Sequence, residues 1–171
     1  MTRQGGDEVD ELVAAWQREL PELATAELEL AKRAAKLSAI LGGASKDVIS
    51  DHGLTWAEFD VLATLRRSGP PYQLRPSALT RSLLFTSGGI SNVLQRLEAA
   101  GLVERGEDSS DARSRWVQLT MKGQQEAEAV LRASAEAQDD VLMEVPPSVL
   151  RSAADALREV LLALRPPPRP R

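Results

Sequence analysis

The side chains best suited by type and spacing to a chemical task lie between Thr86 and Thr120. The apolar residues at the start of this stretch recur at spacings of three and four, as on one face of a helix: Ile90, Val93, Leu94 and Leu97. The polar residues between them fall on the other face: Ser91, Asn92, Gln95 and Arg96. Thr86 or Ser87 can cap the start of this helix, and Gly101 suits a left-handed end. Hydroxyl, amide and guanidinium groups on one free face are typical of a surface that reads hydrogen-bonding edges.

The first turn of this helix carries almost no side-chain bulk, because it consists of Ser87, Gly88 and Gly89. Its backbone N–H groups can therefore approach an anion closely, and the positive end of the helix dipole favours one. A phosphate or a base edge is the expected partner. The residues alone leave another interpretation open, in which the glycines only ease the packing of an ordinary amphipathic helix.

After this helix come two short segments with the composition of strands, separated by a polar stretch, which predicts a hairpin with a mobile tip. The segments are residues 102–105 and 116–119, and the stretch between them is GEDSSDARSR, residues 106–115. Asp111 stands two residues before Arg113 and can hold its guanidinium by a fork-like hydrogen bond. A narrow A·T-rich minor groove attracts such an arginine. Arg113 could instead be a solvated hairpin charge, and Arg115 could pair with a nearby acid.

The residue types needed for metal binding or catalysis are scarce. The chain has no cysteine, which excludes disulfides and thiolate metal sites, and its single histidine, His52, excludes a histidine-rich metal site. Neither a nucleophile elbow nor a glycine-rich phosphate loop is present. We therefore expect no enzyme activity, no cofactor and no metal, with an enzyme kept only as the distant alternative.

The charge is unevenly distributed, although the net charge of the 171 residues is -4. Residues 7–30 carry eight acids against one arginine. Residues 70–97 carry no acid and three arginines: Arg75, Arg81 and Arg96. The middle of the chain is thus its basic part, as expected for a polyanion partner. No apolar run approaches the roughly 20 residues that span a bilayer, and the N-terminus is acidic, so we expect a cytoplasmic protein without membrane contact.

The segments that precede residues 86–120 are expected to be helices that hold this stretch in position. One is expected over residues 7–20, and a longer one from Pro21 to about Ser50, with a possible bend at Gly42-Gly43. Thr55 and Glu58 form a capping box for the next helix. SGPPYQL is expected to be a loop, and a short helix with Pro76 in its first turn follows. Two helices before a hairpin are the order of a winged helix-turn-helix, so the expected fold is mainly α with a small β-hairpin.

Two further helices are expected on the C-terminal side, one beyond Gly123 and one that follows Pro146-Pro147 with Ser148 as its cap. The helices outside the winged part have more apolar surface than it can cover, which predicts a dimer. The expected organisation is a set of N-terminal helices with a dimerisation role and a possible effector pocket, a winged DNA-binding region, C-terminal dimerisation helices and a disordered tail. The corresponding ranges are 7–52, 54–120, 121–165 and 166–171.

Three motifs resemble those of the multiple antibiotic resistance regulator (MarR) family: TSGGISNVLQRLEAAGLVER, DARSR and LTMKG. The resemblance extends from the helix near Leu23 to the helix that ends near Leu164. It implies a homodimer joined through its terminal helices. It also implies that a recognition helix, here Ser87 to Arg96, enters each major groove and that a wing arginine, here Arg113, enters each flanking minor groove.

A finer resemblance concerns the branch of this family that responds to urate and has an extra N-terminal helix. Trp16, Asp60 and Arg105 match the tryptophan, aspartate and arginine of that branch. Val93 stands where the branch has an arginine, so a charge-assisted contact of about 1.5 to 3 kcal/mol is lost, which argues against urate. Read from the residues alone, Trp16 more often belongs to a core, and Asp60 more often faces water.

The expected function is that of a homodimeric regulator of transcription, acting as a repressor of a pseudo-palindromic operator in double-stranded DNA and released by a small aromatic or anionic effector. The residues expected to approach bases or phosphates are Ser87, Gly88, Gly89, Ser91, Asn92 and Gln95. Arg81 and Arg96 are expected to hold the DNA backbone, and Arg113, with Arg115 beside it, the minor groove. A winged domain that binds proteins or shapes DNA without an effector is the competing hypothesis.

Overall fold

The structure is a computed structural model that describes residues 5–83, 87–108 and 111–164, apart from the side chains of residues 87–88, 107–108 and 111–115. Seven α-helices, one short 3-10 helix and three strands occur in these ranges. In chain order they are α1 (Glu8–Glu19), η1 (Pro21–Leu23), α2 (Ala26–Asp51), α3 (Trp56–Arg67), β1 (Gln73–Leu74), α4 (Pro76–Leu83), α5 (Ser87–Ala99), β2 (Val103–Asp108), β3 (Asp111–Leu119), α6 (Met121–Leu142) and α7 (Pro147–Ala163).

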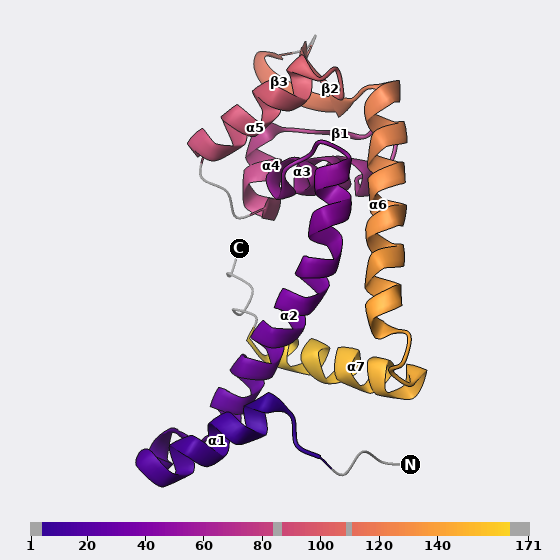
Figure 1. Ribbon diagram of the computed structural model, residues 1–171. Coiled ribbons are helices and arrows are strands. Elements are labelled where there is room, and N and C mark those ends of the chain that lie inside the picture. Colours follow the sequence, from indigo (N-terminus) through magenta and orange to yellow (C-terminus); the bar gives the residue numbers. More distant parts are fainter. Residues whose placement is uncertain (1–4, 84–86, 109–110, 165–171) are drawn as a thin grey trace.

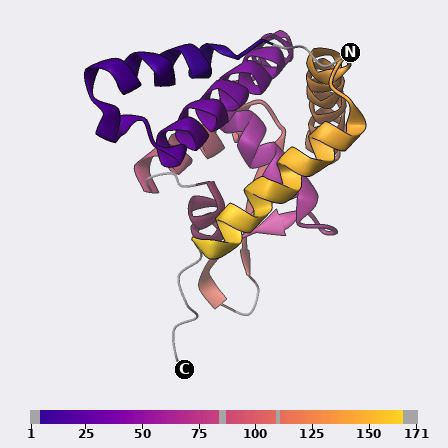
Figure 2. The same cartoon turned by 90° about the horizontal axis from the view of Figure 1, so that it is seen from below.

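The chain has two ends joined by long helices (Figure 1). The elements α3, α4, α5 and the three strands gather at one end, and α1 and α7 lie at the other. The helices α2 and α6 run between the two ends. The view turned by 90° shows that α1 lies beside the N-terminal half of α2 (Figure 2). This arrangement confirms the predicted fold class, a mainly helical chain with a small sheet.

A three-stranded antiparallel sheet with the order β1-β3-β2 forms the wing and its base. The predicted hairpin is present, but its strands are longer than predicted, since β2 continues to Asp108 and β3 begins at Asp111. The predicted strand ends, with residues 106–115 left to the tip, were therefore wrong, and residues 109–110 lie outside the described part. The strand β1 was missed, because two residues after a proline-rich turn show no alternation of their own.

One core cluster holds the winged end together, and each of its elements contributes an apolar face. Leu62 and Leu65 of α3 pack with Leu79 of α4, with the buried face of α5 and with Val117 of β3. Ala127 of α6 completes this cluster. The apolar face of α5 is thus buried in the core and holds this helix in place with its polar face outward. Burial of apolar surface is the largest favourable contribution to folding.

Helix boundaries agree with several of the capping predictions. The capping box of Thr55 and Glu58 is present, and α2 ends at Asp51 with His52 as its C-cap. The helix α2 begins at Ala26 after a 3-10 turn, five residues later than Pro21, because Thr25 caps it. It continues through Gly42 and Gly43 without interruption.

Three boundaries differ from the predictions or cannot be compared with them. The helix α6 begins at Met121 and not beyond Gly123, since Thr120 caps it. The predicted Ser148 cap of α7 is wrong, because Pro146 occupies the N-cap without a side-chain hydrogen bond. The predicted Thr86 cap of α5 and the predicted disordered tail 166–171 lie outside the described residues. No helix of the described chain is long and apolar enough to cross a membrane.

Candidate nucleic-acid interface

The helix α5 buries one face and exposes the other, as predicted. Ile90, Leu94 and Leu97 are buried in the core cluster, and Val93 is partly buried against it. The exposed residues are Gly89, Ser91, Asn92, Gln95 and Arg96. The backbone of Ser87 and Gly88 forms the first turn of α5, but their side chains lie outside the described part. The structure thus brings the described members of the predicted set together on one exposed helix face.

A buried carboxylate on α3 joins this helix to its neighbour. Glu58 is only 4% exposed, and its Oε1 lies 3.0 Å from Nε of Arg96. Nη2 of Arg96 donates to Oε2 of Glu58 at 3.4 Å, and the backbone N–H of Thr55 donates to the same oxygen at 2.7 Å. Glu58 therefore satisfies the start of α3 and holds a guanidinium of α5. The sequence predicted the cap but gave no signal for Arg96, because the contact spans 38 residues.

The C-terminal end of α5 is tied to the start of α6. Gly101 has a φ of 70°, the left-handed conformation predicted for it. Thr120 Oγ1 donates to the carbonyl of Gly101 at 2.7 Å, and Lys122 Nζ donates to the carbonyl of Ala100 at 2.8 Å. A Cβ at Gly123 would collide with the carbonyl of Leu102. The LTMKG motif thus joins the end of α5 to the start of α6, a role that the sequence did not reveal.

The wing carries the two predicted arginines on β3. Arg115 stands opposite Glu107 in the antiparallel register, and Arg113 lies two residues nearer the tip, where the register is irregular. The side chains of both arginines, and the predicted Asp111–Arg113 hydrogen bond, lie outside the described part. At the base of the wing, Trp116 stands opposite Gly106 and its indole occupies the space that a Cβ at that glycine would need.

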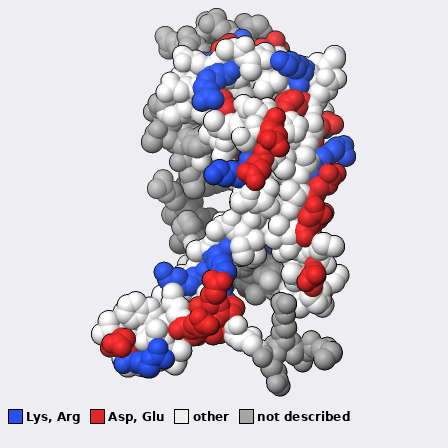
Figure 3. Space-filling view, viewed as in Figure 1, with Lys and Arg blue, Asp and Glu red and all other residues white. Residues whose placement is uncertain are grey.

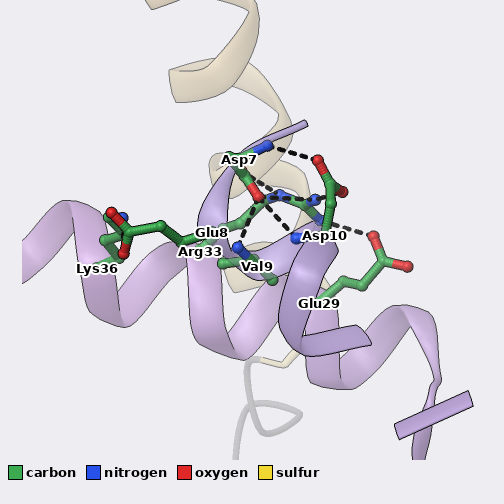
Figure 4. Close-up of polar contacts among 7 residues, drawn as sticks. All are labelled: Asp7, Glu8, Val9, Asp10, Glu29, Arg33 and Lys36. Atoms are coloured by element: carbon green, nitrogen blue, oxygen red, sulfur yellow. Dashed lines mark hydrogen bonds and ion pairs between the residues drawn. The ribbon is translucent and has the colours of Figure 1, made fainter. Parts of the chain in front are cut away.

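The basic groups of the winged end differ in whether a carboxylate pairs with them, since Arg96 and Arg105 lie beside Glu58 and Glu98. Arg81 is exposed on α4, and the described residues offer it no ion-pair partner. In Figure 3 acidic side chains line the visible face of α6, whereas at the lower end acids and bases meet side by side. The lower cluster joins α1 to α2, since Arg33 lies 2.9 Å from Asp7 and 2.6 Å from Asp10 (Figure 4).

The three residues matched to the urate-responsive branch lie apart within the chain. Trp16 belongs to α1 and lines a cavity of about 320 Å³ with η1 and the start of α2, whereas Asp60 and Arg105 belong to the winged end (Figure 1). Burial raises the pKa of the Asp60 carboxyl, and nearby Arg67 partly opposes this rise. Arg105 forms an ion pair of 3.1 Å with Glu98.

The described residues show no group of three or more histidines, cysteines or acids that could hold a metal ion. His52, the single histidine, lies with Nδ1 2.6 Å from Oε1 of Glu126 on α6. This contact joins the end of α2, where His52 is the C-cap, to α6.

Comparisons with known proteins agree with this geometry. The model of the MarR family matches residues 52–114. The transcriptional regulator PecS of Dickeya dadantii is 33% identical over 135 residues, which cover 79% of this chain and 81% of PecS. It is named as a helix-turn-helix transcriptional regulator, not as an enzyme.

Solved structures share the fold. Sco3205 of Streptomyces coelicolor, a MarR family regulator in complex with DNA, gives a TM-score of 0.69 at 24% identity and covers 84% of this chain and 91% of its own. BpsR of Bordetella bronchiseptica gives 0.65 at 20% identity and covers 77% of this chain and 98% of its own. Because the MarR family model matches residues 52–114 and PecS is 33% identical over 79% of this chain, the chain belongs to the MarR family of DNA-binding transcriptional regulators.

Proposed function

We propose that the protein is a homodimeric repressor that places one α5 helix in the major groove of each half of a pseudo-palindromic operator. The observation that carries this proposal is the exposed polar face of α5, whose opposite face is buried in the core. Serine, asparagine and glutamine can donate to base edges and accept from them, and the major groove gives each base pair a distinct pattern. A two-fold dimer then reads half-sites roughly 34 Å apart.

The dimer is supported by α7, which contributes no buried residue to the single chain. Leu161 and Leu164 on this helix are 66% and 73% exposed, and Leu30, Leu37 and Ile40 of α2 are exposed as well. An amphipathic helix with no fully buried residue in its own chain gains little from hydrophobic burial, so it needs a partner. A second copy supplies the same apolar surface by symmetry. The dimer is therefore assigned to α7 with the N-terminal part of α2.

The proposed contacts with the DNA backbone flank α5. Arg81 on α4 and Arg96 on α5 hold phosphates, and Arg113 on the wing enters the minor groove, with Arg115 beside it. Arg96 is 63% exposed although it binds Glu58, so part of its guanidinium remains free for a phosphate. Ser87 and Gly88 complete the set through the backbone at the start of α5.

The proposed effector is a small aromatic or anionic molecule that lodges between the helical end and the winged end. BpsR, which has this fold, has its DNA binding regulated by 6-hydroxynicotinic acid. A cavity of about 760 Å³ lies between α2 and the start of α3, with Lys46 and Trp56 in its wall. Asp60 lies one helical turn after Trp56. Because Trp16 is remote from this cavity in one chain, an effector that also touches Trp16 would have to reach it through the second copy.

Genomic fragments bound by the purified chain, followed by a salt titration of the best fragment, test the proposal. Recovery of a pseudo-palindromic sequence and a steep fall in affinity with salt are expected, since phosphate contacts release counterions. Arg81→Gln should weaken binding, and Arg132→Gln on the exposed side of α6 should leave it unchanged. Uniform recovery of fragments would instead support a DNA-shaping role, and no recovery would overturn DNA binding.

A further inference from the structure

A buried polar cluster lies between α2 and α6, outside the core cluster of the winged end. Ser45 of α2 is fully buried, and Ser134 of α6 is 4% exposed. The hydroxyl of Ser134 donates to Oγ of Ser45 at 2.8 Å, and Nε2 of Gln138, one turn further along α6, donates to the same oxygen at 2.9 Å. Ser45 itself donates to the carbonyl of Leu41 at 3.3 Å. Two donors of α6 therefore converge on one buried oxygen of α2.

This cluster uses the full hydrogen-bonding capacity of the Ser45 hydroxyl, which can donate once and accept twice. All three positions are occupied within the chain, two of them by groups of α6. Ser134 and Gln138 lie on one face of α6, so a rotation of α6, or a slide along α2, withdraws both of them from Ser45 together. A buried hydroxyl without a partner costs free energy, and this cost penalises other arrangements of the two helices.

The apolar part of the same contact contains few large side chains. The buried residues of α2 are Ser45 and Ile49, and those of α6 are no larger than valine: Gly123, Ala127, Val130 and Ser134. Small side chains let two helices approach closely, but they leave the register weakly specified by shape. A buried polar contact can select one register of packed helices. The hydrogen bonds of Ser45 are therefore the feature of this contact that distinguishes one register from its neighbours.

The cluster lies where the two helices begin to separate. On its winged side, the half-buried side chains of His52 and Glu126 join the same helices at 2.6 Å. On the opposite side, no hydrogen bond or ion pair joins α2 to α6 among the residues that the structure describes. A space of about 390 Å³ opens there, with Gln138 and Leu157 of α7 in its wall. Figure 1 shows the two helices diverging toward α7. Ser45 thus provides the last polar link before the end assigned to the dimer.

We propose that Ser45, together with Ser134 and Gln138, is a positioning residue that fixes the crossing of α2 and α6 and thereby the half-site spacing that the dimer accepts. The helix α6 holds the end of α5 through Thr120 and Lys122, whereas α7 and the N-terminal part of α2 are assigned to the dimer. The crossing therefore determines where each α5 lies relative to the dimer axis. This consequence for spacing rests on the proposed function, but the crossing itself depends neither on DNA nor on a second copy.

The first test measures the crossing without DNA. The chain has no cysteine, so Ala35→Cys on α2 and Glu136→Cys on α6 allow a spin label at each of two exposed positions. An excess of unlabelled chain restricts the distance measured by pulsed electron paramagnetic resonance to one copy. The labelled chain should give one narrow distance, and adding Ser45→Ala with Ser134→Ala should broaden or shift it. Adding Gln138→Ala alone, which removes one of the two bonds between the helices, should have a smaller effect of the same kind.

Urea unfolding separates positioning from folding. The double variant removes both buried hydroxyls, and the half-buried Gln138 can reach water, so the midpoint should stay close to that of the wild type. Ser50→Ala is the matched control, because this serine is exposed on α2, and it should change neither the midpoint nor the distance. A narrow, unshifted distance in the folded double variant would overturn the proposal. If the double variant does not fold, an unchanged distance in Gln138→Ala overturns it.

The second test measures spacing on DNA. The recovered operator is compared with versions in which one base pair is inserted or removed between the half-sites. The wild-type chain should bind these versions about tenfold more weakly or worse, because a two-fold dimer reads half-sites at a fixed separation. The double variant should discriminate about threefold less or better tolerate them still, since specificity is a difference between two affinities. Ser50→Ala should behave as the wild type does.

The outcomes on DNA distinguish the inference from the proposed function. An equal loss of affinity at every spacing would indicate general damage and would overturn the positioning role. Unchanged discrimination in the double variant would overturn the link between the crossing and the spacing. If the chain binds no DNA fragment, the proposed function fails, while the spin-label distances still decide whether Ser45 fixes the crossing.

Discussion

Glu58 of α3 and Arg96 of α5 form a two-point ion pair in which the carboxylate is buried and the guanidinium is largely exposed, with Nε of Arg96 3.0 Å from Oε1 of Glu58. The same carboxylate accepts hydrogen bonds from the backbone N–H and the hydroxyl of Thr55, both at 2.7 Å. One buried side chain therefore fixes both the beginning of α3 and the orientation of α5.

Glu58→Gln should lower the free energy of unfolding by about 1 to 3 kcal/mol, because an amide cannot replace a charge-assisted bond to Arg96 within a nearly dry site. Urea denaturation followed by circular dichroism measures this change. Glu136→Gln, at an exposed carboxylate of α6, should change the stability by less than about 0.5 kcal/mol. Equal stability of the two variants would mean that the ion pair contributes nothing.

Arg113→Ala should weaken operator binding by about 1 to 3 kcal/mol if the wing enters the minor groove. A gel-shift titration at fixed salt measures the affinity, and Arg132→Ala provides the control for a lost surface charge. Unchanged binding in Arg113→Ala would remove this arginine from the interface.

Gly106→Ala should destabilise the chain by about 1 to 3 kcal/mol, because the added methyl group collides with the indole of Trp116. Gly43→Ala is the matched control, since nothing lies within 4 Å of its Cβ position in the interior of α2. There the change should raise stability by about 0.5 to 1 kcal/mol through the lower chain entropy of alanine. Thermal or urea unfolding of both variants should therefore give shifts of opposite sign. Two shifts of the same sign would contradict the assigned role of Gly106.

The attachment of α1 to α2 should weaken in acid. The pKa of the Asp7 carboxyl is lowered, chiefly by its hydrogen bond from Arg33. A carboxyl whose pKa is lower in the folded state contributes stability above its unfolded pKa, and that contribution is lost as the pH falls through the folded pKa. We therefore expect α1 to lose hydrogen-exchange protection, corrected for the intrinsic rate, below about pH 4.

Asp7→Asn serves as the reference for this pH dependence, because its amide has no charge to lose. Protection of α1 in this variant should be lower at neutral pH and should change less on acidification. Asp60 acts in the opposite direction, since burial raises its pKa and its protonation in acid relieves a cost. Loss of protection in α3 before α1 would contradict the expected order.

A Leu161→Lys, Leu164→Lys variant should be monomeric if α7 forms the dimer interface, because two buried ammonium groups per copy oppose association strongly. Sedimentation velocity gives the state of assembly. Met121→Lys is the control, since this residue is 77% exposed but belongs to the winged end. It should leave the dimer intact, and dissociation by both variants would point to general destabilisation.

Local patterns predicted local structure well. The spacing of Ile90, Leu94 and Leu97 gave the buried face of α5, and Thr55 with Glu58 gave the cap of α3, because both depend on residues within two helical turns. The order of helices and hairpin was enough for the winged fold. The polar residue types in the sequence of α5 also predicted which of its residues are exposed.

Contacts between distant segments could not be read in this way. The pairing of β1 with β3, the Glu58–Arg96 ion pair and the hydrogen bonds from Thr120 and Lys122 to the end of α5 join residues 18 or more positions apart. No local periodicity encodes them. Because local patterns do not encode distances between segments, Trp16 and Asp60 could be matched to one family site although they belong to opposite ends of a single chain.

The hydrogen bonds of Thr120 and Lys122 to the end of α5 couple the orientation of α5 to that of α6. The 22 residues of α6 extend about 33 Å, so a tilt of about 5° around its start displaces its far end by about 3 Å. In the proposed dimer, a small change in how two copies of α7 meet would therefore turn the two α5 helices relative to each other. Regulation of the proposed dimer then requires no deformation of the exposed face of α5, only a change in the angle at which that face is presented to DNA.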